Sequence, residues 1–145
     1  MYSGIEIYEK SSSASAVFSY LASSGLLKNN LRCSGCRKTM RLKFVKKGDS
    51  VIWRCRSLRC NNREVSVRKD SVFFNIKIPL KIIFLIIYEW SLNSRIKDIK
   101  TRLGVGYKAI NSVLSEIRKK IINLKFEKIG GPKCIIEIDE TAVTK

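Results

Sequence analysis

Four of the five cysteines in the chain form two close pairs, and their spacing is typical of a metal-binding site. Two residues separate Cys33 from Cys36, four separate Cys55 from Cys60, and eighteen lie between the pairs. Structural Zn²⁺ takes four tetrahedrally arranged sulfur or nitrogen ligands, and two short turns joined by a hairpin can bring four thiolates together. The chain contains no histidine. We therefore predict a structural Zn²⁺ site formed by Cys33, Cys36, Cys55 and Cys60.

The residues between and around the two pairs predict the frame of a zinc ribbon. Residues 40–45 and 51–54 have the composition of strands, and residues 47–50, Lys-Gly-Asp-Ser, have the composition of a turn. Gly35 gives the first Cys-x₂-Cys turn the backbone freedom to bring amide groups close to sulfur. Four residues separate Cys55 from Cys60, a spacing that is still within the range of structural zinc ligands.

Two alternatives for the cysteines are a pair of disulfides or four unrelated buried thiols. The N-terminal region has no stretch that resembles a cleaved signal, which favours a reducing compartment. In such a compartment paired cysteines favour metal over disulfides. The fifth cysteine, Cys134, stands in an apolar run, where we expect a small buried side chain.

Positive charge is concentrated in two blocks of the chain. The sequence has 29 lysines and arginines against 12 acidic residues, a formal net charge of +17. Residues 31–70 hold thirteen basic and three acidic residues, and residues 95–128 hold ten and three. Such blocks favour the phosphate backbone of nucleic acid, since each neutralised phosphate releases counterions. A merely solvated basic face is the alternative.

Three helices are expected after the cysteines. Residues 78–90 are apolar nearly all round and follow the pattern of a buried helix that begins at Pro79. A membrane span is the alternative, but the run is too short and contains Lys81 and Glu89. Residues 94–104 and a helix from Tyr107 follow, separated by a turn that contains Gly104 and Gly106. This arrangement predicts a helix-turn-helix, with an ordinary helical hairpin as the alternative.

Two groups of side chains are predicted to contact DNA. The polar face at the start of the last helix can reach base edges in a major groove, and basic residues of the ribbon and of the last helix can contact phosphates. The predicted DNA-binding residues are Lys43, Lys46, Lys47, Arg54, Arg56, Tyr107, Lys108, Asn111, Ser112, Ser115 and Arg118.

The C-terminal segment predicts a β-strand that ends in carboxylates. Gly130-Gly131-Pro132 breaks the preceding helix, and residues 134–138, which are mostly apolar, have the composition of a strand. A buried strand that delivers Asp139 at its end could position a metal ligand. Taken alone, such a carboxylate is usually just solvated.

The order of these motifs resembles the N-terminal part of Merlin-type transposases and their bacterial insertion-sequence relatives. The resemblance covers most of the chain from about Ala16. It is carried by GLLKNNLRCSGCRKTMRL, the cysteine quartet, IPLKIIFLIIYEW, IKDIKTRLGVGYKAINSVLSEIRKKI and IIEIDET. The resemblance implies a cut-and-paste DNA transposase whose catalytic domain has the ribonuclease-H-like fold. Asp139 then corresponds to the first catalytic aspartate of an Asp-Asp-Glu set that holds two Mg²⁺ ions in a full-length relative. Such relatives commonly have two residues between the second pair of cysteines where this chain has four, so Cys60 is the weakest member of the predicted ligand set.

Together these inferences predict an α+β protein in four parts. We expect an N-terminal helical segment with a short helix (1–30), a zinc ribbon (31–72), a helical region with the helix-turn-helix (73–129) and the first strand of an incomplete ribonuclease-H-like domain (130–145). Because the second aspartate and the glutamate would lie beyond the last residue, we expect DNA binding without strand cleavage by this chain alone.

The expected partner is double-stranded DNA and not a membrane. The expected compartment is the nucleus in a eukaryote, or otherwise the cytoplasm or nucleoid, without secretion. The oligomeric state is open, a dimer included. A standalone zinc-ribbon and helix-turn-helix regulator is the main alternative function, and an RNA-binding or ribosome-associated ribbon protein is a weaker one.

Overall fold

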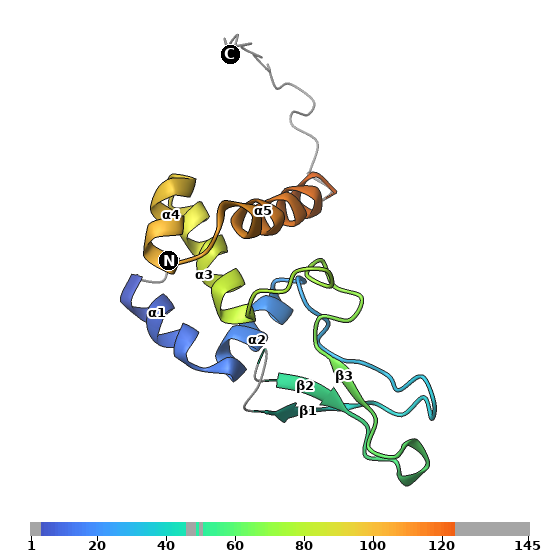
Figure 1. The fold of residues 1–145 in the computed structure, drawn as a ribbon. Helices are drawn as coiled ribbons and strands as arrows, with labels where there is room; N and C mark the ends of the chain where they lie inside the picture. The colour runs from blue at the N-terminus through green and yellow to red at the C-terminus, as the bar shows by residue number, and fades with distance from the viewer. Residues whose placement is uncertain (1–3, 46–48, 50, 124–145) are drawn as a thin grey trace, which may run out of the picture.

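The computed structural model describes residues 4–45, 49 and 51–123, which form an α+β fold (Figure 1). The described part contains five helices and one three-stranded antiparallel sheet. In chain order the elements are α1 (Gly4–Ser12), α2 (Ala14–Ser23), β1 (Arg41–Phe44), β2 (Val51–Arg54), the 3₁₀ turn η1 (Leu58–Cys60), β3 (Glu64–Ser66), α3 (Leu80–Ser91), α4 (Ile96–Leu103) and α5 (Tyr107–Ile122). The N-terminal segment thus contributes two helices where one short helix was expected.

The sheet has an apolar face and a polar face. Its strand order is β1-β2-β3, and Leu42, Trp53 and Val65 are aligned across the three strands. Side chains alternate between the faces of a sheet, so these three share one face. The sequence predicted the β1–β2 hairpin, which is confirmed. It did not predict β3, because Glu-Val-Ser is short and carries a single apolar residue.

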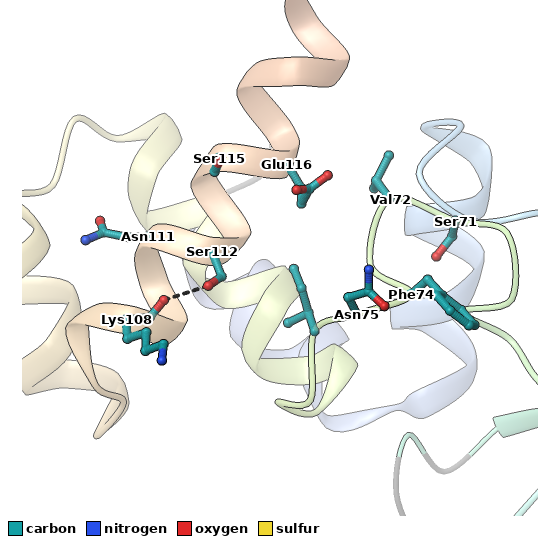
Figure 2. A pocket seen from close by; sticks show the side chains of 10 residues that line it. Ser71, Val72, Phe74, Asn75, Lys108, Asn111, Ser112, Ser115 and Glu116 are labelled. Atoms are coloured by element: carbon teal, nitrogen blue, oxygen red, sulfur yellow. Dashed lines mark hydrogen bonds between the residues drawn. The ribbon is translucent and has the colours of Figure 1, made fainter.

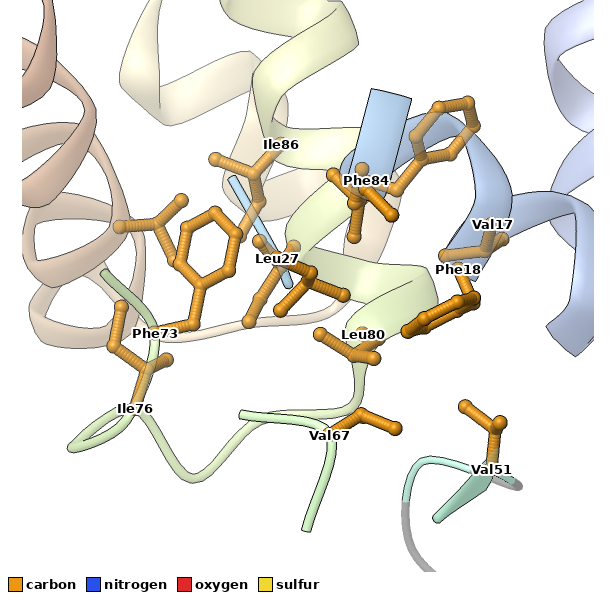
Figure 3. Packing of buried hydrophobic residues seen from close by; sticks show 14 of the residues in the cluster. Val17, Phe18, Leu27, Val51, Val67, Phe73, Ile76, Leu80, Phe84 and Ile86 are labelled. Carbon is orange, nitrogen blue, oxygen red and sulfur yellow. The ribbon is translucent and has the colours of Figure 1, made fainter. Parts of the chain in front are cut away.

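An aromatic contact joins the sheet to the helices. Trp53 on β2 is 4% exposed, and its ring meets the ring of Phe18 from α2 edge-to-face with centroids 5.8 Å apart. Aromatic pairs of this geometry add about 0.5–1.5 kcal/mol to the burial of their surface. The cysteine-bearing sheet and the helices therefore share one apolar core, part of which Figure 3 shows.

Helix α3 lies at the centre of the helical part and contacts α1, α2, α4 and α5. Leu80, Ile83, Phe84 and Ile86 are at most 2% exposed, and Figure 3 shows several of them packed with residues of other elements. The prediction of a buried helix from the apolar run is confirmed. Over the residues that the structure describes, no helix is long and apolar enough to cross a membrane.

A buried ion pair connects the β1–β2 turn to the start of α3. Arg68 is 7% exposed and donates hydrogen bonds to both carboxylate oxygens of Asp49 and to the carbonyls of Ile76 and Ile78. The other interaction of Asp49 is with α3, whose Leu80 amide donates to the carboxylate over 3.1 Å. The Arg68 guanidinium therefore joins Asp49 to the segment that leads into α3.

A second buried carboxylate connects α1, α3 and α4. Glu89 on α3 is 4% exposed and accepts hydrogen bonds from the hydroxyls of Tyr8 and Ser94 and from the guanidinium of Arg102. Burial alone would raise the pKa of Glu89. The hydrogen bonds from Ser94, Arg102 and Tyr8 outweigh burial and hold the pKa below its ordinary value.

Glu89 is expected to make the fold sensitive to acid. A carboxyl group with a lowered pKa stabilises the fold above its unfolded pKa, about 4.3, and this contribution is lost as the pH falls through the folded pKa. Glu89→Gln should therefore reduce the free energy of unfolding by about 1–3 kcal/mol at pH 7 and by less near pH 3. Urea unfolding at both pH values measures this difference, with Glu9→Gln, on an exposed residue of α1, as control. An equal loss at both pH values would contradict this account.

The turn between α4 and α5 follows the glycine signals in the sequence. Gly104 has a φ of 64° at the C-cap of α4, where a side chain would be strained. Gly106 is the N-cap of α5. Because it has no side chain, it accepts no capping hydrogen bond from the first amides of the helix. Ile99 of α4 and Ile110 and Leu114 of α5 are fully buried, so the turn brings two apolar faces onto α3.

Candidate metal centre and neighbouring basic surfaces

The four predicted cysteine ligands lie together in one cluster. All four Sγ atoms lie within 4.8 Å of one another. Contacts join the two turns, with Cys33 Sγ 3.7 Å from Cys60 Sγ and Cys36 Sγ 3.5 Å from Cys55 Sγ. Zn–S bonds of about 2.3 Å in a tetrahedron place sulfur atoms about 3.8 Å apart. The cluster is therefore compatible with a structural metal ion.

The same distances do not fit disulfides. A disulfide requires sulfur atoms about 2.05 Å apart, and Cys33, Cys36, Cys55 and Cys60 are all free thiols. Contacts of 3.7 and 3.5 Å also link each cysteine of the first pair to one of the second. A metal ion in the cluster would thus join two segments of the chain as well as closing each turn.

The first pair is shaped by a tight turn. The Arg37 amide donates to the Cys33 carbonyl over 2.8 Å, and Arg37 has a φ of 58°. The amides of Gly35 and Cys36 approach Cys33 Sγ, as expected, although Gly35 does not adopt a left-handed conformation. A Cβ at this position would lie 3.2 Å from Cys60 Sγ, and glycine therefore allows the second pair to approach closely.

The second pair reaches the cluster through the 3₁₀ turn η1. This turn spans Leu58–Cys60 and ends at Asn61, which has a φ of 43°. The extra residues between Cys55 and Cys60 are taken up by the turn, which returns the Cys60 sulfur to 3.7 Å from Cys33. Cys60 therefore lies within the cluster, although its spacing had made it the weakest member of the predicted set.

Backbone amides favour negative charge at the first pair of sulfurs. Amides of Cys36 and Gly35 point at Cys33 Sγ and lower the pKa of Cys33 to about 6. The Lys38 amide likewise lowers the pKa of Cys36. Thiolates are the species that bind metal, so the first turn is prepared for a cation.

The second pair of sulfurs holds its protons more strongly. The Ser57 amide, 3.4 Å from Cys55 Sγ, favours the thiolate, but burial and the Cys36 sulfur outweigh it and raise the pKa of Cys55. The hydrogen bond with Cys36, together with burial, raises the pKa of Cys60 to about 12. A metal ion would have to displace these protons, which makes metal binding dependent on pH.

Several predicted DNA-binding residues of the ribbon gather on the polar face of the sheet. Arg54 lies directly opposite Arg41 across the β1–β2 pair, a like-charge arrangement that destabilises a sheet. Glu64 on β3 partly offsets it, with Lys43 Nζ 2.8 Å and Arg54 Nε 4.0 Å from the same carboxylate oxygen. This surface, here called the sheet hollow, has a volume of about 390 Å³ and is lined by Arg41, Leu42, Lys43, Arg54, Arg56 and Asn62.

A second basic hollow, which the sequence analysis did not single out, adjoins the cysteine cluster. It has a volume of about 630 Å³, and Arg37 and Lys38 of the first cysteine turn face Arg59 and Arg63 of the second. We call this surface the knuckle hollow. Its signal was present in the sequence, since all four basic residues lie within three positions of a cysteine.

The predicted contact face of α5 lines a cavity of about 610 Å³. Lys108, Asn111, Ser112 and Ser115 form one wall, and the loop of residues 71–76 forms the other (Figure 2). The Ser112 hydroxyl donates to the Lys108 carbonyl within the helix. Glu116, also on this wall, pairs with Lys119 over 2.7 Å. The face is thus polar, and its one carboxylate has a cationic partner.

Two other predicted residues of α5 make cation–π contacts. Tyr107 is 48% exposed, and Lys100 Nζ lies 4.6 Å from its ring centroid. The exposed guanidinium of Arg118 lies 5.7 Å from the ring of Trp90 on α3. Both contacts fix the ends of side chains that would otherwise be mobile, and they leave Tyr107 on the surface beside Lys108.

Four of the predicted features lie outside the residues that the structure describes. Lys46 and Lys47 belong to the β1–β2 turn, and Cys134 and Asp139 belong to the C-terminal segment. The predictions for these residues remain sequence-based.

Comparisons with known proteins identify one distant relative and no family. No family model matches the chain, and no solved structure matches it. The chain is 26% identical over 144 residues to the male abnormal protein mab-31 of Caenorhabditis elegans, a match that covers 87% of this chain and 34% of that protein. The chain thus spans about a third of the length of this relative.

Proposed function

We propose that this chain is a DNA-binding region of a DDE-type transposase. The observation that supports the proposal best is the packing of a four-cysteine sheet and a helix pair on one core, each with a cationic or polar surface. In this proposal residues 31–72 are a zinc ribbon, and Zn²⁺ bound by the four cysteines has a structural role. The metal would hold the basic loops in place and take no part in chemistry.

Helices α3, α4 and α5 are proposed to form the helix-turn-helix. The three helices contact one another, and residues 104–106 connect α4 to α5, a turn length typical of this motif. An α-helix about 10–12 Å across fits a major groove about 12 Å wide. Lys108 and Asn111 would then face the DNA, with Lys108 on phosphate and Asn111 on a base edge.

The catalytic part of the proposal rests on the resemblance to Merlin-type transposases. Asp139 would be the first aspartate of the catalytic set, and Mg²⁺ would act only in a full-length relative that also supplies the other carboxylates. The match to about a third of mab-31 is compatible with a region of a longer protein.

A standalone regulator is the second candidate. It is favoured by one observation, which is that the described sheet and helices share one apolar core. The two candidates differ in the reaction that they support. A transposase region requires an in-frame second aspartate and glutamate in the gene and inverted repeats beside it, and their absence would favour the regulator.

Duplex DNA binding is expected to depend steeply on salt. Each phosphate contact on duplex DNA contributes about −0.9 to the slope of log K against log salt. If both basic regions contact phosphates, the slope should be roughly −5 or steeper. Fluorescence anisotropy with a labelled duplex from 50 to 300 mM KCl would measure it. Absent or salt-insensitive binding would contradict the proposed function.

The contact face of α5 can be tested in the same assay. Asn111→Ala should reduce affinity for a duplex selected from a random pool by about 1–3 kcal/mol, since a base-edge contact is lost. The variant should retain its binding to unselected DNA. Asn29→Ala, an exposed change in the loop after α2, is the matched control. Equal behaviour of the two variants would exclude α5 as the helix that contacts bases.

A further inference from the structure

The knuckle hollow concentrates positive charge that the described part of the protein does not neutralise. Four cationic side chains line it, and no carboxylate does within residues 4–45, 49 and 51–123. None of the four forms an ion pair with a described carboxylate. In the sheet hollow, by contrast, Glu64 pairs with Lys43 and Arg54. The cysteine turns therefore carry four cations that no described carboxylate engages, which makes them a candidate surface for an anion.

Neutralising the cysteine sulfurs is not a sufficient role for these side chains. Four thiolates and one Zn²⁺ carry a net charge of −2, which leaves two of the four positive charges without compensation. Backbone amides already donate hydrogen bonds to the sulfurs, for example the Ser57 amide to Cys55 Sγ. Cys33 and Cys55 are 2% and 1% exposed, whereas Arg37, Lys38 and Arg59 are exposed. Their charges thus face the solvent.

The hollow has a form suited to phosphates. Its cations come from both cysteine turns, so they surround the space from two sides. Arg63 is held in place by a hydrogen bond of 2.6 Å from its Nη1 to the Ser34 hydroxyl. A guanidinium presents a planar fork of donors that matches two oxygens of one phosphate. A volume of about 630 Å³ that opens beside exposed basic residues suits a chain of phosphates more than one small buried anion.

We propose that the knuckle hollow binds the phosphate backbone of duplex DNA, with Arg37, Lys38, Arg59 and Arg63 as contacts. The inference rests on the proposed DNA-binding function and goes beyond it. It adds the cysteine turns to the sheet face as a proposed ribbon contact with DNA. It also makes that contact dependent on the metal, since metal binding would hold the two turns at their present separation.

The test compares two double variants of the full chain with equal loss of charge. Lys38→Gln/Arg59→Gln removes two cations from the hollow and leaves the Arg63–Ser34 hydrogen bond intact. Lys28→Gln/Lys81→Gln removes two cations that line neither of the two basic hollows. Binding to a labelled 20-base-pair duplex is measured from 50 to 300 mM KCl, with bound Zn²⁺ determined for each protein.

The hollow variant is expected to lower the magnitude of the salt slope by about 1.8 and to weaken binding roughly 60-fold at 0.1 M salt, the effect of losing two phosphate contacts. Its zinc content should match that of the wild type, and Lys38→Arg/Arg59→Lys should restore both slope and affinity. The control pair should change the slope by much less.

Three results would overturn the inference. The first is a hollow variant whose slope equals that of the control pair while the wild type binds DNA, which would leave the proposed function intact. The second is a hollow variant that loses binding to an RNA hairpin while its binding to duplex DNA is unchanged. The third is a wild type that does not bind duplex DNA, which would overturn the proposed function as well.

Discussion

Replacing Cys55 with serine is expected to abolish stoichiometric zinc binding and to unfold the sheet region. Cys55 follows β2 directly, is 1% exposed and lies 3.5 Å from Cys36 in the cluster. Structural Zn²⁺ contributes about 10–16 kcal/mol of apparent binding free energy in zinc-finger peptides. That quantity equals or exceeds the whole stability of a typical domain, about 5–15 kcal/mol. The region around the cysteines should therefore not fold without its metal.

Metal analysis of the purified chain is the direct measurement. The wild type should contain about one Zn²⁺ per chain, and Cys55→Ser much less. Cys134→Ser is the matched control, because it removes the cysteine that lies outside the quartet, and it should retain the metal. A wild-type protein that is folded and free of metal would disprove the site.

Chelation gives an independent readout through Trp53. This side chain lies two residues before Cys55 and packs against Phe18. Loss of the metal should release the sheet and move the fluorescence of Trp53 to longer wavelength. Much of the helical circular dichroism should persist, since α3, α4 and α5 contact one another. Addition of Zn²⁺ should reverse the change.

Replacing Arg68 with methionine is expected to destabilise the protein by about 3–5 kcal/mol, the usual effect of removing one partner from a buried ion pair. The side chains of Arg68 and Asp49 are 9% and 13% exposed, so solvent screens the pair little. The change leaves the Asp49 carboxylate without its counterion and the carbonyls of Ile76 and Ile78 without a donor. Urea unfolding of metal-loaded protein would measure the loss.

Two further variants distinguish loss of the Arg68–Asp49 ion pair from the general effect of replacing an arginine. Arg68→Lys keeps the charge but cannot reach the carboxylate and two carbonyls with one planar fork, so it should recover only part of the stability. Arg95→Met removes the ion pair with Asp98, in which the Arg95 side chain is 71% exposed. This change should lower the free energy of unfolding by less than about 1 kcal/mol. Similar losses for Arg68→Met and Arg95→Met would refute the structural role of Arg68.

Local signals in the sequence predicted the elements that depend on neighbouring residues. The apolar run after Pro79 became the buried helix α3, and Gly104 ended α4 in a left-handed conformation. The strand-like composition on either side of residues 47–50 predicted β1 and β2. These features follow from periodicity and backbone preference, which act within a few residues. Helix α1 has a weaker pattern and was not recognised as a separate element.

The candidate site shows the limit of such signals. Spacing predicted which cysteines belong together, but not that Cys33 contacts Cys60 and Cys36 contacts Cys55. The position of Cys60 depends on η1, whose 3₁₀ geometry is not evident from Leu-Arg-Cys. The four basic residues of the knuckle hollow were likewise distributed over two turns. Only the approach of those turns places them around one space.

The sequence by itself determined that this chain would form an α+β protein with a four-cysteine cluster and a buried apolar helix, because spacing and periodicity are properties of the chain. Only the tertiary structure decided which charges remain available to an anion. Glu64 lies beside Lys43, Asp49 beside Arg68 and Glu89 beside Arg102, and none of these partners is a neighbour in sequence. Electrostatic attraction depends on distance in space, so the sequence did not show which basic residues have an acidic partner in the fold.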